Sequence, residues 1–483
     1  MKNKRILFYI LIIVSFITMS VLLSKKLLQN DTFYTIKVGE SISKYGVDMK
    51  EHFSWISNLV YTYPHWLYDF FIYFLYNIGG FNLLYLSTIV LGFTLLTLMY
   101  KYTNKLVDNK AISYLLVLVF SIFLHGFFTV RAQMFSYIFL ITILYSIEML
   151  RNTKKKRYYC YIFICSLLIA NMHLAVWPFI FVLYLPFVTQ DLIYIIIKKF
   201  NLKFINNYNI EVENSNLKIT LLAVLITFIT GFMTPNFLIP FTYFINTYKG
   251  PSVDYISEHS PLTINDRIEI YAMIFIFIAI LIKKNKKVKL RDLFMICGLF
   301  LISFMSYRNV SLFFILSIFS FGRLLNNKNS LLIDVIDNRA FQLILFVFFS
   351  STLFVAIKHN NGKVYYSENE YPVKASDYIV QKLDYKNMKL FNKYDYGSYL
   401  IFRDIPVFID SRADLYLKEF NKNCNVFEDY IDIFYNYADV FSSYGVTHIL
   451  IKNNDKLNYL LKNDDNYKVL YLDSNFTLYQ ILT

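Results

Sequence analysis

Residues 30–79 gather the side chains of this chain that are best suited to acid–base chemistry. The segment opens NDTFYTIKVGE, continues through EHFSW and closes YTYPHWLYDFFIYFLYNIGG, directly after a long apolar run. A connection between two apolar segments does not need such residues, and long loops tend to be functional. We therefore predict that the segment forms one wall of a catalytic cavity on the outer side of a membrane. Its ionisable candidates are Asp31, Glu51, His52, His65 and Asp69.

Asp31 is the candidate general base. It lies where the first apolar run ends, with low-dielectric surroundings on one flank and a polar loop on the other. Such surroundings can raise the proton affinity of a carboxylate, as a base requires. The alternative is structural, because Asn30-Asp31-Thr32 is also well suited to cap a short helix.

Arg131 and Arg308 are candidates for binding an anion. They occur in FFTVRAQMFSY and MSYRNVSLFF, each at a short turn between two apolar segments. Ionisable groups at this depth usually face a cavity or a partner. The planar fork of arginine is the side chain that best grips phosphate. In the alternative interpretation, both side chains reach out to lipid headgroups.

Three further groups have weaker signals. Asn171 and His173 lie in the tight turn ANMHLAVWP, where a lone histidine is more often a hydrogen-bonded interface residue than a ligand. His65 and Asp69 could bind a metal together with His52, but scattered ligands favour a structural role and no metal is predicted.

The third group lies in the C-terminal part, in DYGSYLIF and PVFIDSRADLY. Asp410, Arg412 and Asp414 could bind an acceptor, or they could form a buried ion network at the end of a strand. The sequence contains no phosphate-binding loop, dinucleotide-binding glycine pattern, nucleophile elbow or paired cysteine motif. Soluble-nucleotide chemistry is therefore disfavoured, and no cofactor is expected.

Composition places these candidates in a polytopic membrane protein. Of 483 residues, 56% are hydrophobic and only 17% are charged, and the apolar residues form runs long enough to cross a bilayer. The net charge of +14 does not indicate nucleic acid, because the positive excess is confined to one part of the chain. Residues 1–357 contain 33 Lys and Arg and 17 Asp and Glu, whereas residues 358–483 contain 15 Lys and Arg and 17 Asp and Glu. The excess thus belongs to loops of the membrane region. Four cysteines imply no disulfide framework.

We predict eleven membrane spans. The basic segments RNTKKKR at 151–157 and KKNKKVKLR at 283–291 indicate the cytoplasmic side. The N-terminus is then cytoplasmic, Ile6–Leu23 is an uncleaved anchor rather than a signal peptide, and everything after about Lys358 is extracytoplasmic. The spans lie near 6–27, 80–100, 111–130, 133–151, 158–172, 176–197, 218–235, 268–283, 292–307, 309–324 and 340–357.

This topology places all seven histidines on one side. They lie outside or near the outer ends of spans, which a general preference of histidine for interfaces does not explain. Two outer loops are long, 30–79 and 235–267, and the aromatic-rich stretch 64–76 is predicted to lie in the interface plane. The histidines are His52, His65, His125, His173, His259, His359 and His448.

The predicted fold is an α-helical polytopic membrane domain, 1–357, followed by a small α/β domain, 358–483. The strands expected in the second domain are MKLFNKY, PVFID, VTHILI, KVLYLD and FTLYQI. The last two are separated by Ser474 and Asn475, which suggests a hairpin. Between Leu417 and Tyr444 the apolar spacing is more helical.

The order of these blocks resembles bacterial GT-C-type membrane glycosyltransferases. NDTFYTIKVGESISKYGV, EHFSW and a Trp-Leu helix ending in Gly-Gly look like the first outer loop of that group. VRAQMFSY, NMHLAVW, YRNVSLF and YDYGSYLIF followed by PVFIDSRADLY look like later blocks of a largely uncharacterised branch. The resemblance covers most of the chain in order.

The resemblance implies an active site that faces outward and a sugar donor linked to a polyprenyl phosphate. It also implies an acidic base in the first outer loop, which is Asp31 by position. Many relatives have a Glu before the Trp-Leu pair, where this chain has His65. A second acidic role would then fall to Glu51 or Asp69. The expected partners are membrane lipid, the lipid-linked sugar and an acceptor in the cell envelope.

Two other classes of function remain open from the sequence. A transporter or flippase for a lipid-linked or anionic substrate would use the same arginines, and it would need helices broken near mid-membrane. A non-catalytic scaffold could bind a wall polymer or a partner protein through its outer domain. In that case Asp31 and both arginines would be replaceable.

Overall fold

The computed structural model divides the chain into two compact units. Unit 1 comprises Met1–Lys25, Tyr85–Phe241 and Ile256–Gly362, and unit 2 comprises Lys26–Leu84, Thr242–Tyr255 and Lys363–Thr483. Each unit therefore combines segments that are far apart in the sequence. The residues that the structure describes are 2–201, 210–256, 260–263, 266–283, 287–326, 335–336, 338–422 and 424–482.

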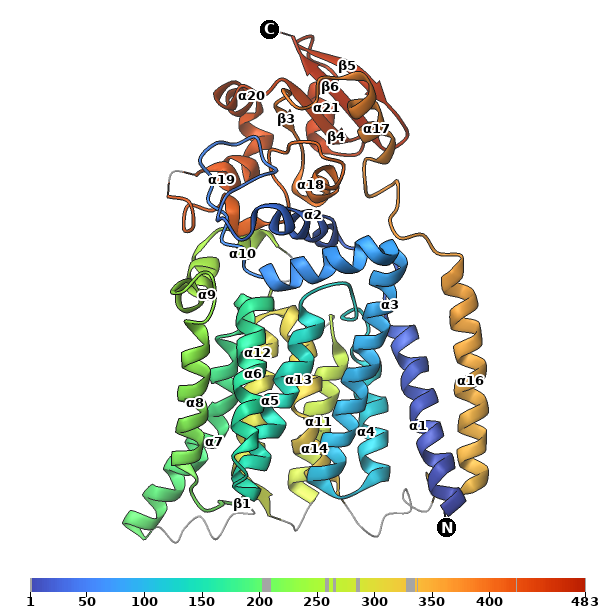
Figure 1. The fold of residues 1–483 in the computed structure, drawn as a ribbon, viewed down its shortest axis with the longest axis vertical. Coiled ribbons are helices and arrows are strands. Elements are labelled where there is room, and N and C mark those ends of the chain that lie inside the picture. Colours follow the sequence, from blue (N-terminus) through green and yellow to red (C-terminus); the bar gives the residue numbers. More distant parts are fainter. Residues whose placement is uncertain are drawn as a thin grey trace. The chain divides into compact units, whose positions relative to one another are not determined.

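Unit 1 is a bundle of helices, in which α1 packs against α16 (Figure 1). Two short strands, β1 (Ile210–Glu211) and β2 (Val288–Lys289), pair in parallel within it. Its helices are α1 (Lys2–Leu23), the second part of α3 (Trp66–Val107), α4 (Lys110–Ile122), α5 (Gln133–Thr153), α6 (Arg157–Met172), η1 (Leu174–Val176), α7 (Phe179–Phe200), α8 (Leu217–Gly231), α11 (Ile268–Lys283), α12 (Leu290–Met305), η4 (Tyr307–Asn309), α13 (Val310–Leu316), α14 (Ile318–Leu325) and α16 (Arg339–Asn361).

Several of these helices are apolar enough to cross a membrane. Among the described residues, 5 helical segments pass by length and composition, and a bent pair, Tyr307–Leu316 with Ile318–Leu325, would make a sixth. The eleven predicted spans are therefore not confirmed as a number, because four further apolar helices have only 10–17 residues. The 5 segments are Ile6–Leu23, Trp66–Val107, Gln133–Thr153, Leu174–Phe200 and Arg339–Asn361.

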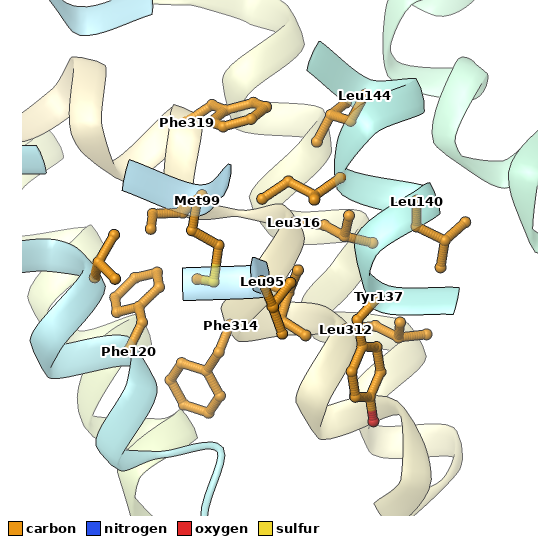
Figure 2. Close-up of a cluster of buried hydrophobic side chains, with 14 of the residues drawn as sticks. Leu95, Met99, Phe120, Tyr137, Leu140, Leu144, Leu312, Phe314, Leu316 and Phe319 are labelled. Atoms are coloured by element: carbon orange, nitrogen blue, oxygen red, sulfur yellow. The ribbon is translucent and has the colours of Figure 1, made fainter. Parts of the chain in front are cut away.

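The core of unit 1 consists of closely packed apolar side chains. Figure 2 shows Leu95 and Met99 of α3 beside Phe120 of α4, with Phe314 and Leu316 of α13. Between helices that cross a membrane, the dispersion attraction of closely packed side chains contributes to stability in place of removal from water.

Charged side chains connect helix ends that the sequence predicts to be cytoplasmic. Arg151 of α5 makes two hydrogen bonds to Asp191 of α7, at 2.6 and 2.8 Å. Arg291 of α12 contacts Glu148 of α5 at 2.9 Å, and Arg323 of α14 contacts the same carboxylate. Such buried charges are tolerated because each has a partner of opposite sign.

Unit 2 combines helices with a four-stranded sheet of order β3-β4-β6-β5. β3 (Leu390–Phe391) runs parallel to β4 (His448–Lys452), and β4 and β5 (Tyr467–Leu472) are both antiparallel to β6 (Phe476–Ile481). The hairpin predicted at Ser474 and Asn475 is confirmed by the pairing of β5 with β6. Its helices are α2 (Asn30–Tyr45), the first part of α3, most of α9 (Ile239–Lys249), α10 (Ser252–Tyr255), α17 (Val373–Lys382), α18 (Tyr394–Phe402), η5 (Ala413–Tyr416), α19 (Val426–Ile431), α20 (Ile433–Tyr444) and α21 (Lys456–Leu461).

The segment PVFID is not a strand of this sheet. Val407 forms only an isolated bridge with Ser54 of the predicted outer loop. The amide side chain of Asn392 accepts from the Phe408 N–H at 2.9 Å and donates to the Ile409 carbonyl at 2.7 Å. These bonds occupy backbone groups that a sheet ladder would need.

Helix α3 contains a break at Gly79 and Gly80. Gly80 has a φ of +58° and Gly79 a ψ of 16°, so the helix does not continue regularly through the pair. Glycine is suited to this turn because it lacks the Cβ that makes positive φ costly. This break lies between two predicted segments, the interfacial stretch 64–76 and the membrane span that starts near residue 80.

Candidate functional site

A histidine–carboxylate pair forms the centre of the candidate site in unit 2. His65 precedes α3 and Asp69 lies in its first turn, so the two side chains share one helix face. His65 Nδ1 lies 2.9 Å from both carboxylate oxygens of Asp69. Its Nε2 lies 3.1 Å from the hydroxyl of Tyr34 in α2. The Asp69 side chain is completely buried, and that of His65 is 17% exposed.

Other carboxylates act on His65 within the same unit. Burial by itself lowers the pKa of His65. The charge and the hydrogen bond of Asp69 outweigh this effect of burial, and the charges of Asp414 and Asp31 raise the pKa further. The pKa of His65 therefore lies above its ordinary value. Burial raises the pKa of Asp414, although His65 and Arg412 partly offset the increase. The Thr62 hydroxyl donates to Asp414 at 3.3 Å. His65 is therefore favoured as a cation in an acidic surrounding.

Asp31 occupies the first turn of α2 and is half-buried. The residue that caps this helix is Gln29, not Asp31, and its side chain makes no capping hydrogen bond. The neighbouring Asn30 donates to the Tyr394 carbonyl at 2.9 Å, which fixes the start of the helix. Negative charge is favoured at a helix N-terminus, so the Asp31 carboxylate lies where the helix dipole stabilises it.

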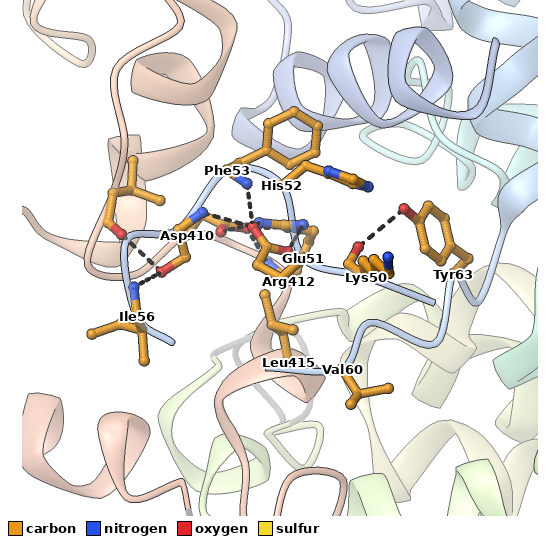
Figure 3. A network of polar contacts seen from close by, with 12 residues as sticks. Lys50, Glu51, His52, Phe53, Ile56, Val60, Tyr63, Asp410, Arg412 and Leu415 are labelled. Atoms are coloured by element: carbon orange, nitrogen blue, oxygen red, sulfur yellow. Dashed lines mark hydrogen bonds and ion pairs between the residues drawn. The ribbon is translucent and has the colours of Figure 1, made fainter. Parts of the chain in front are cut away.

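Glu51, Arg412 and Asp410 form a buried ion network (Figure 3). The Arg412 guanidinium donates to Glu51 at 2.7 and 3.0 Å and to Asp410 at 2.8 Å. It also lies over the rings of Phe53 and Tyr61, at 5.2 and 4.9 Å. The Arg412 side chain is 1% exposed. These residues therefore have the arrangement of a buried ion network, which is one of the two alternatives that the sequence left open; the other is acceptor binding.

His52 takes a different partner from His65. Its Nε2 lies 3.0 Å from Asp48, and its ring stacks on Tyr45. Within the described part of the chain, no group of three or more His, Cys, Asp or Glu has the arrangement to hold a metal ion. His259 lies outside the described residues.

Arg308 and His173 are brought together in unit 1. Arg308 Nη2 lies 3.2 Å from His173 Nε2, and His173 Nδ1 lies 2.8 Å from the hydroxyl of Ser136. A guanidinium has no lone pair to offer, so Nε2 is the acceptor and the ring proton belongs on Nδ1. The sequence reasoning treated His173 separately, whereas the structure makes it a direct support of Arg308.

Asn171 and Arg131 have structural surroundings of their own. The Asn171 amide donates to the carbonyls of Leu167 and Met233, at 2.9 and 3.1 Å, which ties α6 to the turn after α8. Arg131 is half-buried, just before α5, and its backbone N–H donates to the Thr129 carbonyl at 2.8 Å.

Sequence reasoning missed Arg267, a further cation of unit 1, at the end of the predicted outer loop 235–267. Its guanidinium donates to the Tyr307 hydroxyl at 2.6 and 3.0 Å and to the His125 carbonyl at 3.0 Å. It also pairs with Glu269 at 3.1 Å. Arg267 directly precedes an apolar run, as Arg131 and Arg308 do, and this shared signal could have found it.

An apolar cavity of about 200 Å³ lies between α7 and α12 in unit 1. Leu183 and Pro186 line it from α7, and Met295 and Leu299 line it from α12. Its lining is suited to hydrocarbon and offers little to a polar ligand.

Comparisons of sequence found no relatives. No family model matches the chain, and no curated protein matches it.

Solved structures share its fold at low identity. An oligosaccharyltransferase from Archaeoglobus fulgidus in the apo form has a TM-score of 0.55 at 12% identity, over 93% of this chain and 69% of its own. The same enzyme tethered to an acceptor peptide containing the NVT sequon gives 0.52 at 11%, over 92% and 69%. ArnT from Cupriavidus metallidurans bound to undecaprenyl phosphate gives 0.51 at 11% identity, over 98% and 97%. The resemblance to GT-C-type polytopic membrane glycosyltransferases that the sequence motifs indicated is therefore confirmed as a shared fold.

Proposed function

We propose that this protein is a membrane glycosyltransferase that moves a sugar from a polyprenyl-phosphate donor to an extracytoplasmic acceptor in the cell envelope. The observation that carries the proposal is the cluster of Asp31, Tyr34, His65 and Asp69 in unit 2. It occurs in a chain that shares the fold of ArnT, whose structure holds undecaprenyl phosphate, and of an oligosaccharyltransferase.

The proposed reaction is a displacement at the anomeric carbon of the donor sugar. Asp31 accepts the proton of the acceptor hydroxyl, whose oxygen forms the new bond to the anomeric carbon. The bond from that carbon to the phosphate oxygen breaks, and polyprenyl phosphate leaves with the electron pair. Because phosphate leaves well without a proton, one carboxylate suffices, in contrast to the paired acids of glycosidases.

His65 acts in this proposal as a positioning residue. As a cation held by Asp69 and Tyr34, it supplies positive charge that interacts with the Asp31 carboxylate. Within unit 1, Arg131 and Arg308 are the candidates for binding a phosphate group, and His173 orients Arg308. The apolar cavity between α7 and α12 has the chemistry to hold part of a prenyl chain.

Replacement of Asp31 tests the proposal. Cells that lack the gene would be complemented with the wild type, with Asp31→Asn or with the exposed control Asp465→Asn, and polyprenyl-linked sugars and envelope glycans would be compared by mass spectrometry. We expect Asp31→Asn to lower transfer by about 10²- to 10⁴-fold while the protein remains folded and inserted. Full transfer by Asp31→Asn would reject the role of this residue.

One observation favours a second function, that of a transporter or flippase. α13 and α14 meet at a bend of 46°, as the two halves of a broken transporter helix do. Reconstituted protein that exchanges a lipid-linked substrate across a bilayer without forming a covalent product would support this alternative. A scaffold would instead show unchanged glycans in every variant.

A further inference from the structure

A polar cavity of about 360 Å³ lies within unit 2. One face of α2 lines it, together with the loop at His52 and the segment that follows α18. None of the residues of the His65–Asp69 pair belongs to this lining. The cavity is therefore a second candidate site, distinct from the one that holds Asp31.

The charges that line this cavity cancel one another. Lys37 pairs with Asp404 at 2.7 Å and also with Glu40, and Glu40 pairs with Lys44 at 2.6 Å. Two ammonium groups thus face two carboxylates, so the cavity has no excess charge with which to attract an anion. Fixed donors and acceptors are instead presented side by side.

Asp404 enters this cavity from the turn that ends α18. Its φ is +59°, which is the left-handed conformation common just after a helix. The Asp404 N–H donates to the Ile401 carbonyl at 2.9 Å, and the Ile405 N–H donates to the Leu400 carbonyl at 3.0 Å. This turn places the Asp404 carboxylate beside Lys37.

An aromatic ring completes the lining. Tyr45, at the end of α2, stacks on the His52 ring with a centroid distance of 5.0 Å and an interplanar angle of 14°. Tyr45 nevertheless remains 62% exposed. Phe53 and Pro406 add apolar surface. Ligand sites commonly combine such apolar surfaces with a few placed polar groups.

We propose that this cavity binds a neutral saccharide. Paired carboxylates and ammonium groups match the hydroxyl groups of a sugar, which are donors and acceptors at once. The exposed ring of Tyr45 and the apolar lining match the C–H faces of a sugar ring. That the saccharide is part of the glycosyl acceptor rests on the proposed function, whereas binding itself does not.

Saturation-transfer difference NMR on the full chain tests the proposal. The protein would be kept in a detergent without a sugar headgroup and titrated with the neutral disaccharides maltose and N,N′-diacetylchitobiose. We expect at least one to bind, and Tyr45→Ala to weaken its binding about tenfold through loss of the stacking surface. Tyr459→Ala in α21, where the tyrosine is 79% exposed, is the matched control and should bind as the wild type does.

Three results would overturn the proposal. The first is the absence of saturation transfer from the protein to both disaccharides. The second is saturation transfer that Tyr45→Ala leaves unchanged. The third is displacement of a bound disaccharide by inorganic phosphate, which would identify an anion site. Asp31→Asn should bind saccharide normally, so loss of transfer activity and loss of saccharide binding are separable outcomes.

Discussion

Arg412 illustrates how a single side chain in unit 2 depends on partners that are remote in the sequence. It is a cation enclosed by two carboxylates, Glu51 and Asp410, and by two aromatic rings. Removing charges from water is costly, and only close pairing compensates for the cost. The network therefore stabilises unit 2 as long as all its members are present. Loss of the Arg412 guanidinium would leave buried carboxylates without a counter-ion.

We expect Arg412→Ala to lower the free energy of unfolding by about 3–5 kcal/mol, because Glu51 and Asp410 would stay buried without their cation. The exposed pair of Lys374 with Glu368, at 61% and 54% exposure, provides the control. Lys374→Ala should cost less than about 1 kcal/mol. Thermal unfolding in detergent, followed by tryptophan fluorescence, measures both. Equal effects of the two substitutions would contradict the role of the network.

His65 predicts a pH dependence of stability. Its pKa in the folded protein lies above the ordinary 6.5, so the folded state binds the proton more tightly than the unfolded chain does. The resulting stabilisation is fully present below pH 6.5 and is lost as the pH rises through the raised value. The difference in melting temperature between the wild type and His65→Gln should accordingly shrink from pH 6 to pH 9. A difference that grows with pH would refute this sign.

At the scale of elements, the site depends on the close approach of α2 to the first part of α3. A Cβ added at Gly39 of α2 would lie 2.2 Å from the Asp69 carbonyl oxygen and 2.5 Å from the Tyr73 Cβ. Glycine at this position lets the two helices approach closely enough for Tyr34 to reach His65. The position of the acid–base pair is thus set by a residue without any functional group.

We therefore expect Gly39→Ala to destabilise unit 2 by about 1–3 kcal/mol and to separate Tyr34 from His65. Gly298→Ala in α12 is the matched control, because a Cβ there meets nothing within 4 Å. That change should be neutral or stabilising by up to about 1 kcal/mol. Thermal unfolding of both variants checks the expectation, and a Gly39→Ala protein as stable as the wild type would exclude close helix packing.

The sequence predicted elements well wherever local pattern determines them. The Gly79-Gly80 break, the hairpin after β5 and the helical character of 417–444 all follow from short-range signals. PVFID failed as a strand because Asn392 occupies the backbone groups of Phe408 and Ile409, which follow it by 16 and 17 residues. Periodicity does not encode such a side-chain bond.

The candidate site was predictable in its parts but not in its pairings. For Asp410 and Arg412 the sequence left open either acceptor binding or an ion network, and their partner Glu51 lies 361 residues from Arg412. The support of Arg308 by His173 spans 135 residues. One sequence carries no signal for contacts of this range, because many carboxylates and histidines are equally compatible with the local pattern.

At the scale of the whole molecule, the distribution of charge predicts an orientation that labelling can test. Lys155, between α5 and α6, is an exposed residue of the basic segment predicted to be cytoplasmic, and Tyr459 is an exposed residue of unit 2. In a protein whose four cysteines are replaced by serine, a membrane-impermeant maleimide should label Tyr459→Cys in intact cells. Lys155→Cys should react only after the membrane is permeabilised. The reverse pattern would invert the topology.

The assembly of unit 2 from Lys26–Leu84, Thr242–Tyr255 and Lys363–Thr483 has a consequence for biosynthesis. Glu51 leaves the ribosome 361 residues ahead of Arg412, which at normal elongation rates is a delay of roughly 20–70 s. During this interval the nascent protein holds a carboxylate destined for burial with no counter-ion yet made. Unit 2 therefore cannot mature until Lys363–Thr483 has been made, and termination of translation before this segment should send the chain to proteolysis.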